Sequence, residues 1–207
     1  MNLEKLKLAE IQFLAAYPGG FSHPDIQAIR KKHNVDKLAD FCQNVFAEEK
    51  FNQPDELLDN WIKVIARSSM ISLFEKPKFK SFINTRQGHE RTALAESLFQ
   101  LLHGNAQDGF ELQVNLLKAE KLAKWSIITA APTYYRLNKE IFIKPTTAKG
   151  VIKHFELNGL TYHPTPTWEF YKNYRKAILQ MRKQVDKSLS LSNPAFSGFL
   201  MMSLPKA

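Results

Sequence analysis

The chain has 207 residues, of which 44% are hydrophobic and 24% are charged, and Cys42 is its single cysteine. These proportions are typical of a globular protein, and they exclude a disordered chain. One cysteine also excludes an internal disulfide and any metal site built from several thiolates. A chain of this length forms one large domain or two small ones.

The lengths of the apolar stretches indicate where in the cell the protein is located. Residues 1–10 alternate charged residues with leucines, without the apolar run of a secretory signal. The longest weakly charged runs, 125–135 and 194–205, contain proline and are shorter than the roughly 18 apolar residues that a spanning helix needs. We therefore expect a cytoplasmic protein that does not associate with a membrane.

Apolar residues at helical spacing predict helices throughout the first half of the chain. Pro18-Gly19-Gly20 ends the first of them, and Gly104 ends the last. Residues 76–80 alternate lysines with proline and phenylalanine, which indicates a loop or the approach to another helix. The expected helices span residues 3–17, 22–33, 37–46, 54–74 and 93–102.

The second half predicts a mixed fold. Residues 125–129 and 140–143 are rich in β-branched and aromatic side chains, and the polar segment 136–139 lies between them, so we expect a β-hairpin there. Helices are predicted over 110–123, 145–155 and 168–186. The expected fold class is mainly α (α+β), with a small antiparallel β element and a long C-terminal helix.

Charge divides the chain into two regions. Residues 1–103, the predicted helical bundle, carry 14 Lys and Arg against 13 Asp and Glu. Residues 104–207, the predicted α+β region, carry 15 against 7, which is most of the net charge of +9. The two regions fold separately or share one continuous core. Such an excess favours a polyanionic partner, although spare surface lysines also produce it.

The predicted C-terminal helix has a cationic face. Its basic residues recur at spacings of three, four and seven, which places them on one side of a helix. Such a face suits phosphate contacts, and Tyr171 and Tyr174 beside it could stack on bases. The alternative is an ordinary solvated face. The candidate phosphate contacts are Lys172, Arg175, Lys176, Arg182 and Lys183.

A second basic cluster surrounds the predicted start of the helix over 145–155. A helix N-terminus favours negative charge, so its threonines and lysines could hold an anion. Plain helix capping with a few surface lysines is the alternative. The candidate residues are Lys144, Thr146, Thr147, Lys149 and Lys153.

Signals for catalysis are weak. The phosphate-loop, dinucleotide-binding, zincin and serine-hydrolase motifs are all missing, and the six histidines are scattered. Residues 28–38 have the rhythm of a helix-turn-helix but lack the small residue and glycine that such turns favour. We expect no cofactor, no metal site and no catalytic residues, although an active site without a local motif stays open.

Two hypotheses follow for function. The first is a non-enzymatic protein that binds nucleic acid, DNA or RNA, through its basic half. The second is a protein-interaction or oligomeric subunit, which forms a homo-oligomer or binds a protein partner. Its docking surface would be the apolar stretch Phe196–Met202, or exposed aromatics such as Tyr134 and Tyr135.

Overall fold

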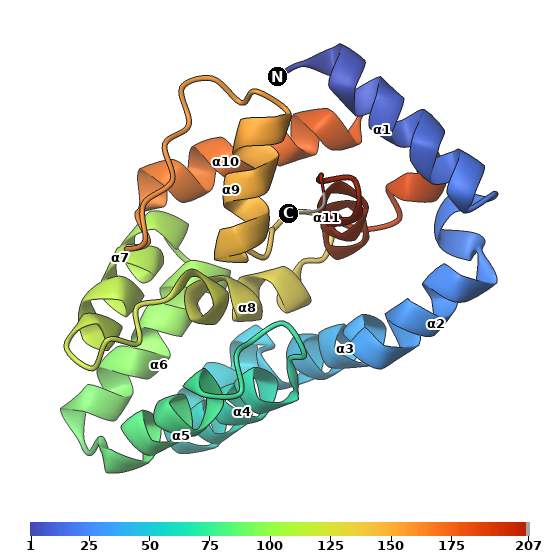
Figure 1. The fold of residues 1–207 in the computed structure, drawn as a ribbon. Helices are drawn as coiled ribbons and strands as arrows, with labels where there is room; N and C mark the ends of the chain where they lie inside the picture. The colour runs from blue at the N-terminus through green and yellow to red at the C-terminus, as the bar shows by residue number, and fades with distance from the viewer. Residues whose placement is uncertain (206–207) are drawn as a thin grey trace.

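The computed structural model describes residues 1–205, and over this range it consists of eleven α-helices joined by turns and three short 3-10 helices (Figure 1). The helices are α1 (Leu3–Ala16), α2 (Pro24–His33), α3 (Val35–Val45), α4 (Pro54–Arg67), α5 (Glu75–Thr85), α6 (His89–Leu102), α7 (Ala106–Lys118), α8 (Trp125–Tyr135), α9 (Pro145–His154), α10 (Trp168–Arg182) and α11 (Asn193–Met202).

Local sequence explains where several helices begin. The side chains of Asn2, Asn105 and Thr167 accept backbone N–H groups in the first turns of α1, α7 and α10. Proline occupies the first turn of α2, α4, α9 and α11, where its missing N–H costs nothing. These signals lie in the sequence itself, which is why most expected helices are present near their predicted ranges.

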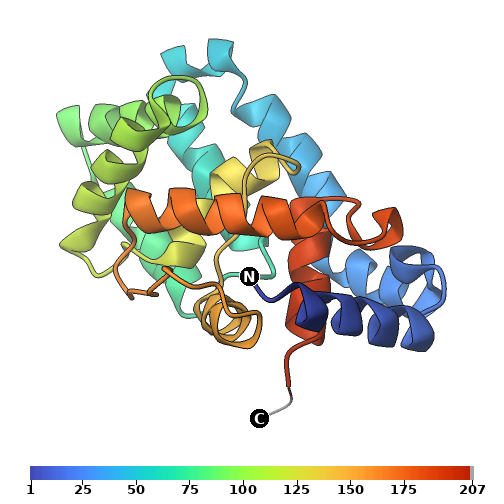
Figure 2. The ribbon, with the colours of Figure 1, turned by 90° about the horizontal axis from the view of Figure 1, so that it is seen from above.

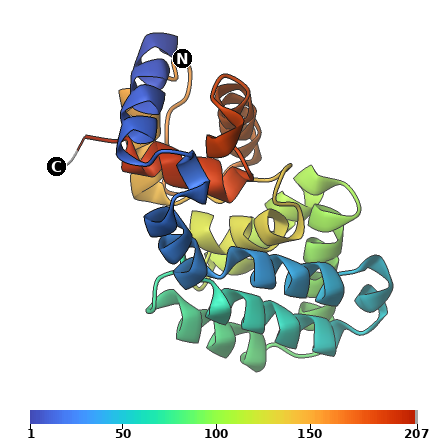
Figure 3. The ribbon, with the colours of Figure 1, turned by 90° about the vertical axis from the view of Figure 1, so that its right-hand side faces the viewer.

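Helix α8 is the centre of the bundle. It packs against α3, α4, α6 and α7, and all residues from Trp125 to Tyr134 are buried. Helices α3, α4 and α5 form a layer on one side of it, while α10 and α11 lie on the other (Figures 1 and 3). In the view from above, α10 (orange-red) crosses the middle of the picture (Figure 2). The bundle is therefore built around a helix with no solvent-exposed face from Trp125 to Tyr134.

The predicted β-hairpin is wrong, because the described residues 1–205 form no strand. Residues 125–129 lie in α8, and 140–143 form an extended segment outside any regular element. A continuous apolar run has the same composition in a buried strand and in a fully buried helix, so periodicity could not separate the two. The β-branched and aromatic residues pointed to the strand, and burial on all sides of α8 overrode that preference.

The extended segment is attached to α8 through a side chain. The Ile143 N–H donates to Thr129 Oγ1 at 3.0 Å, and the same hydroxyl donates to the Trp125 carbonyl at 2.6 Å. Ile141, Phe142 and Ile143 are all buried. The two predicted strands thus do lie side by side, but as a helix and a strap rather than as a hairpin.

Several other boundaries differ from the expected ones, including the starts of α6 and α7, which lie four residues before the expected ones. Residues 76–80 belong to α5, whose buried face includes Phe79, Phe82 and Ile83. Helix α4 ends at Arg67, short of the expected Phe74. The expected 168–186 helix ends at Arg182.

One hydrophobic cluster includes buried residues from both predicted regions. The boundary at His103 falls between α6 and α7, which pack closely along their length. A Cβ atom on Gly109 would lie 2.2 Å from the backbone nitrogen of Leu101, so glycine is required for this close approach. Within residues 1–205, none of the helices is long and apolar enough to span a membrane.

Candidate functional site

Two lysines of α10 and Lys183, the residue that caps its C-terminus, form an outward cationic surface. Lys172, Lys176 and Lys183 are exposed and are separated by four and seven residues, which places them on one side of the helix. No carboxylate of residues 1–205 forms an ion pair with any of them. We refer to these three residues as the lysine face of α10.

Arg175, on the same helix, is directed into the protein. Its guanidinium contacts the Glu140 carboxylate, which also accepts the Tyr171 hydroxyl at 2.8 Å. The guanidinium lies 5.9 Å from the ring centre of Trp168 and 5.3 Å from that of Tyr171. Burial lowers the pKa of Arg175, but the Glu140 charge and the contacts with Glu140 and Tyr171 raise it overall. This arginine therefore joins α10 to the strap.

Arg182 is likewise committed to internal contacts. Its Nε and Nη2 atoms donate to the Ser190 carbonyl at 3.0 and 2.6 Å. Its two Nη atoms reach the side-chain oxygens of Asn193 at 2.7 Å and Asn138 at 2.9 Å. Burial lowers its pKa. Two of the five predicted phosphate contacts on this helix are thus already engaged within the chain.

The tyrosines beside the predicted cationic face are not available for stacking. Tyr171 and Tyr174 are only 1% and 4% exposed. Burial raises the pKa of both phenols, and for Tyr171 the Glu140 charge adds to the effect. Tyr171 packs on Phe110 inside the bundle with ring centres 5.4 Å apart. Stacking on bases would require both rings to leave the core.

The second predicted cluster is spread along α9: Lys144 occupies the N-cap position, whereas Lys153 lies in the last turn and not near the start. Lys144, Thr146, Lys149 and Lys153 are exposed, and Thr147 is half-buried. No side chain caps the first turn of α9, so its leading N–H groups have no side-chain acceptor. The lysines form no ion pair within the described chain, although Lys149 lies 5.1 Å from the ring centre of Tyr162. The cluster therefore keeps its positive charge free.

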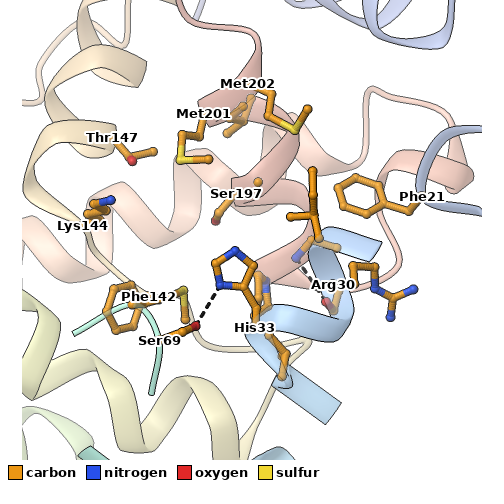
Figure 4. A pocket seen from close by; sticks show the side chains of 18 of the residues that line it. Phe21, Arg30, His33, Ser69, Phe142, Lys144, Thr147, Ser197, Met201 and Met202 are labelled. Carbon is orange, nitrogen blue, oxygen red and sulfur yellow. Dashed lines mark hydrogen bonds between the residues drawn. The ribbon is translucent and has the colours of Figure 1, made fainter. Parts of the chain in front are cut away.

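A pocket of about 250 Å³ opens between α2, α9 and α11 (Figure 4). Its walls are mainly apolar side chains, and Lys144 and Thr147 of the predicted anion cluster lie on one side of it. Sequence reasoning found these two residues but not their partners, because α2 and α11 lie far from α9 in the chain. The apolar part of the lining includes Phe21, Ile26, Phe142, Val151, Leu200 and Met201.

The polar groups of the pocket come from several different elements. His33 of α2 lies within hydrogen-bond distance of the Ser69 hydroxyl, with 2.8 Å between Nδ1 and Oγ. Arg30 pairs with Asp36 at 3.3 Å. Ser197 of α11 also faces the pocket (Figure 4). The arrangement of a few converging polar groups on apolar walls is typical of a binding site for a small molecule.

Helix α11 contains the apolar stretch that was predicted to dock a partner. Phe196, Phe199 and Leu200 are buried in the core, whereas Met201 and Met202 stay partly exposed beside the pocket. Tyr134 is also buried, and its hydroxyl lies 2.9 Å from that of Ser68. A partner at this end of the chain would therefore contact the two methionines rather than the whole stretch.

Chemically reactive arrangements are sparse. Burial raises the pKa of the Cys42 thiol, which disfavours the nucleophilic thiolate. Among the residues that the structure describes, no three His, Cys, Asp or Glu side chains are grouped as metal ligands. Comparison with models of protein families, with curated proteins and with solved structures found no match for this chain.

Proposed function

We propose that this protein binds nucleic acid without catalysing a reaction, through lysines of its basic half. The observation that carries the proposal is the lysine face of α10, where Lys172, Lys176 and Lys183 are exposed and free of carboxylate partners within residues 1–205. Lys144, Lys149 and Lys153 add a second source of unpaired charge. We place the protein in the cytoplasm, in keeping with its buried lone cysteine.

The dimensions of α10 suit a short stretch of backbone. Lys172 and Lys183 lie eleven residues apart, which is about 16 Å along a helix axis. That distance corresponds to roughly five nucleotides at 3.4 Å per phosphate on one strand. Because lysine contacts phosphates as a point charge, binding of this kind is expected to depend on salt and to show little sequence preference.

The test is to measure binding of the purified chain to double-stranded DNA, single-stranded DNA and RNA over a series of salt concentrations. In the variant Lys172→Gln/Lys176→Gln/Lys183→Gln, affinity at low salt should fall. The slope of log K against log salt should shrink by about 2–3, because each lost phosphate contact removes roughly 0.7–0.9 from it. Arg175 and Arg182 stay unchanged, so the fold is kept.

A matched control separates a defined surface from total charge. Lys31→Gln/Lys32→Gln/Lys37→Gln removes three exposed lysines from the neutral region. This control should bind nearly as the unaltered chain does. Equal losses in the two triple variants, or no binding of any nucleic acid at low salt, would overturn the proposal.

A further inference from the structure

We propose that the pocket between α2, α9 and α11 binds a small amphipathic anion, for which a medium-chain aliphatic carboxylate is the model ligand. The inference concerns a different surface from the lysine face of α10 and does not rest on nucleic-acid binding.

The size and the walls of the pocket select a short aliphatic chain. An apolar cavity of about 150 Å³ holds benzene, so the 250 Å³ here corresponds by proportion to about ten non-hydrogen atoms. Ile26, Val151 and Leu200 are buried side chains in the lining, and Met201 lies beside them. Methionine adapts its shape to ligands, which suits a flexible alkyl chain better than a rigid polar ring. Octanoate has the matching number of non-hydrogen atoms.

The charge of the pocket selects an anion. Asp36 is the only acidic residue of the lining, and Arg30 already neutralises it at 3.3 Å. Lys144 has no carboxylate partner within residues 1–205 and sits at the uncapped start of α9. A carboxylate there would gain from the lysine charge and from the helix dipole together. A cation in the same place would be repelled by both.

Hydroxyl donors complete the pocket. Tyr174 of α10 is 4% exposed and belongs to the lining, yet among residues 1–205 its hydroxyl has no hydrogen-bond partner. The hydroxyls of Thr147 and Ser197 are likewise unengaged within the described chain. Hydroxyl groups without a partner in the lining of a pocket can donate to the oxygens of an anion. Figure 4 shows Lys144 and Thr147 on one side and Ser197 near the middle of the pocket.

The experiment is calorimetric titration of the full chain with three ligands of equal chain length: octanoate, octan-1-ol and octylammonium. Octanoate should bind best, octanol more weakly because it lacks the charge, and octylammonium least. Three single variants locate the site. Lys144→Gln should weaken octanoate by about three- to tenfold while leaving octanol almost unchanged.

Of the other two variants, one is a control and the other fills the pocket. Lys139→Gln removes an exposed lysine of the basic half that does not line the pocket, and it should bind octanoate as the unaltered chain does. Ser197→Leu places a bulky side chain in the pocket and should abolish binding of octanoate and octanol alike. Thermal unfolding of each variant shows whether it is folded; if Ser197→Leu is not, Gly198→Val serves instead, since a Cβ there meets only Phe21 at 3.8 Å.

Any of three results would overturn the inference. One is that octanoate shows no saturable binding to the folded chain. The others are that octanoate binds equally well after Lys144→Gln, or no better than octylammonium, because the anion would then not be recognised at this pocket.

Discussion

The arginines and the lysines of α10 have different roles in the protein. Arg175 and Arg182 are partly buried and bond to Glu140, Ser190 and the side chains of Asn138 and Asn193. The lysine face of α10 is exposed and has no ion pair within residues 1–205. The planar guanidinium binds several acceptors at once, whereas the ammonium group stays hydrated.

The number of basic residues on a helix does not give the number that is available to bind a partner. A count of charges treats all five residues of α10 as equivalent, but only three of them are available to a partner. The two arginines instead hold α10 against the strap and the segment that leads into α11. Removing an arginine should therefore affect stability, and removing a lysine should affect binding alone.

The largest expected effect is at Arg182. Arg182→Ala leaves the Ser190 carbonyl and the two asparagine oxygens without their donor, so we expect a loss of about 2–3 kcal/mol in the free energy of unfolding. Lys183→Ala, one residue further on, should change it by less than about 0.5 kcal/mol. Denaturant unfolding of the two variants measures both values.

Equal losses of unfolding free energy in Arg182→Ala and Lys183→Ala would contradict the different roles of the arginines and the lysines. A stability loss at Arg182 together with unchanged nucleic-acid binding would support them, because the two roles would then separate at neighbouring residues.

A smaller effect is expected at Glu140, the partner of Arg175. Glu140→Gln keeps the shape but removes the charge that faces Arg175, and the side chains of the pair are 12% and 24% exposed. We expect a loss of about 1–2 kcal/mol, below the value for a fully buried pair because water screens this one. The exposed Asp40→Asn serves as the control and should change stability by less than about 0.5 kcal/mol. Denaturant unfolding checks this, and equal values for the two variants would contradict a structural role for Glu140.

The sequence predicted elements whose signals are local. Helices α1, α2, α9 and α10 begin at capping residues or prolines, so their starts were expected to within a few residues. The prediction from sequence was wrong at α8, because the helix forms there through packing against neighbours that bury every side of it. The composition of such a segment shows only that it is apolar, and its β-branched residues then favour a strand although the segment is helical.

The candidate sites show the same limit. Lysines at helical spacing can be placed on a common face from the sequence, and the lysine face of α10 was expected in that way. The inward position of Arg175 and Arg182 depends on Glu140 and Ser190, which only the fold brings near. The pocket depends on α2 and α11 meeting α9, a contact between distant segments that carries no local pattern.

The smallest expected effect is at an ion pair whose two side chains are both largely in contact with water. Lys5 and Glu156 join α1 to the end of α9 at 2.7 Å, and both side chains are more than 40% exposed. Hydrogen bonds from Lys5 and Asn2 hold the pKa of Glu156 below its ordinary value of 4.5. The folded state therefore favours the carboxylate, and the contribution is present above about pH 4.5 and is lost as the pH falls through the lowered folded pKa.

Glu156→Gln should accordingly destabilise the chain slightly at neutral pH, and less than Glu140→Gln does, because an exposed pair gains little over its contacts with water. The difference between Glu156→Gln and the unaltered chain should shrink as the pH is lowered below 4.5, since both then carry an uncharged side chain at this position. Thermal unfolding of the two proteins at neutral and acidic pH measures it. If the difference stayed constant with pH, the role of Glu156 would lie in its shape and its bond to Asn2 rather than in its charge. In that case, exposed charges of this protein would serve binding alone, as proposed for the lysine face of α10.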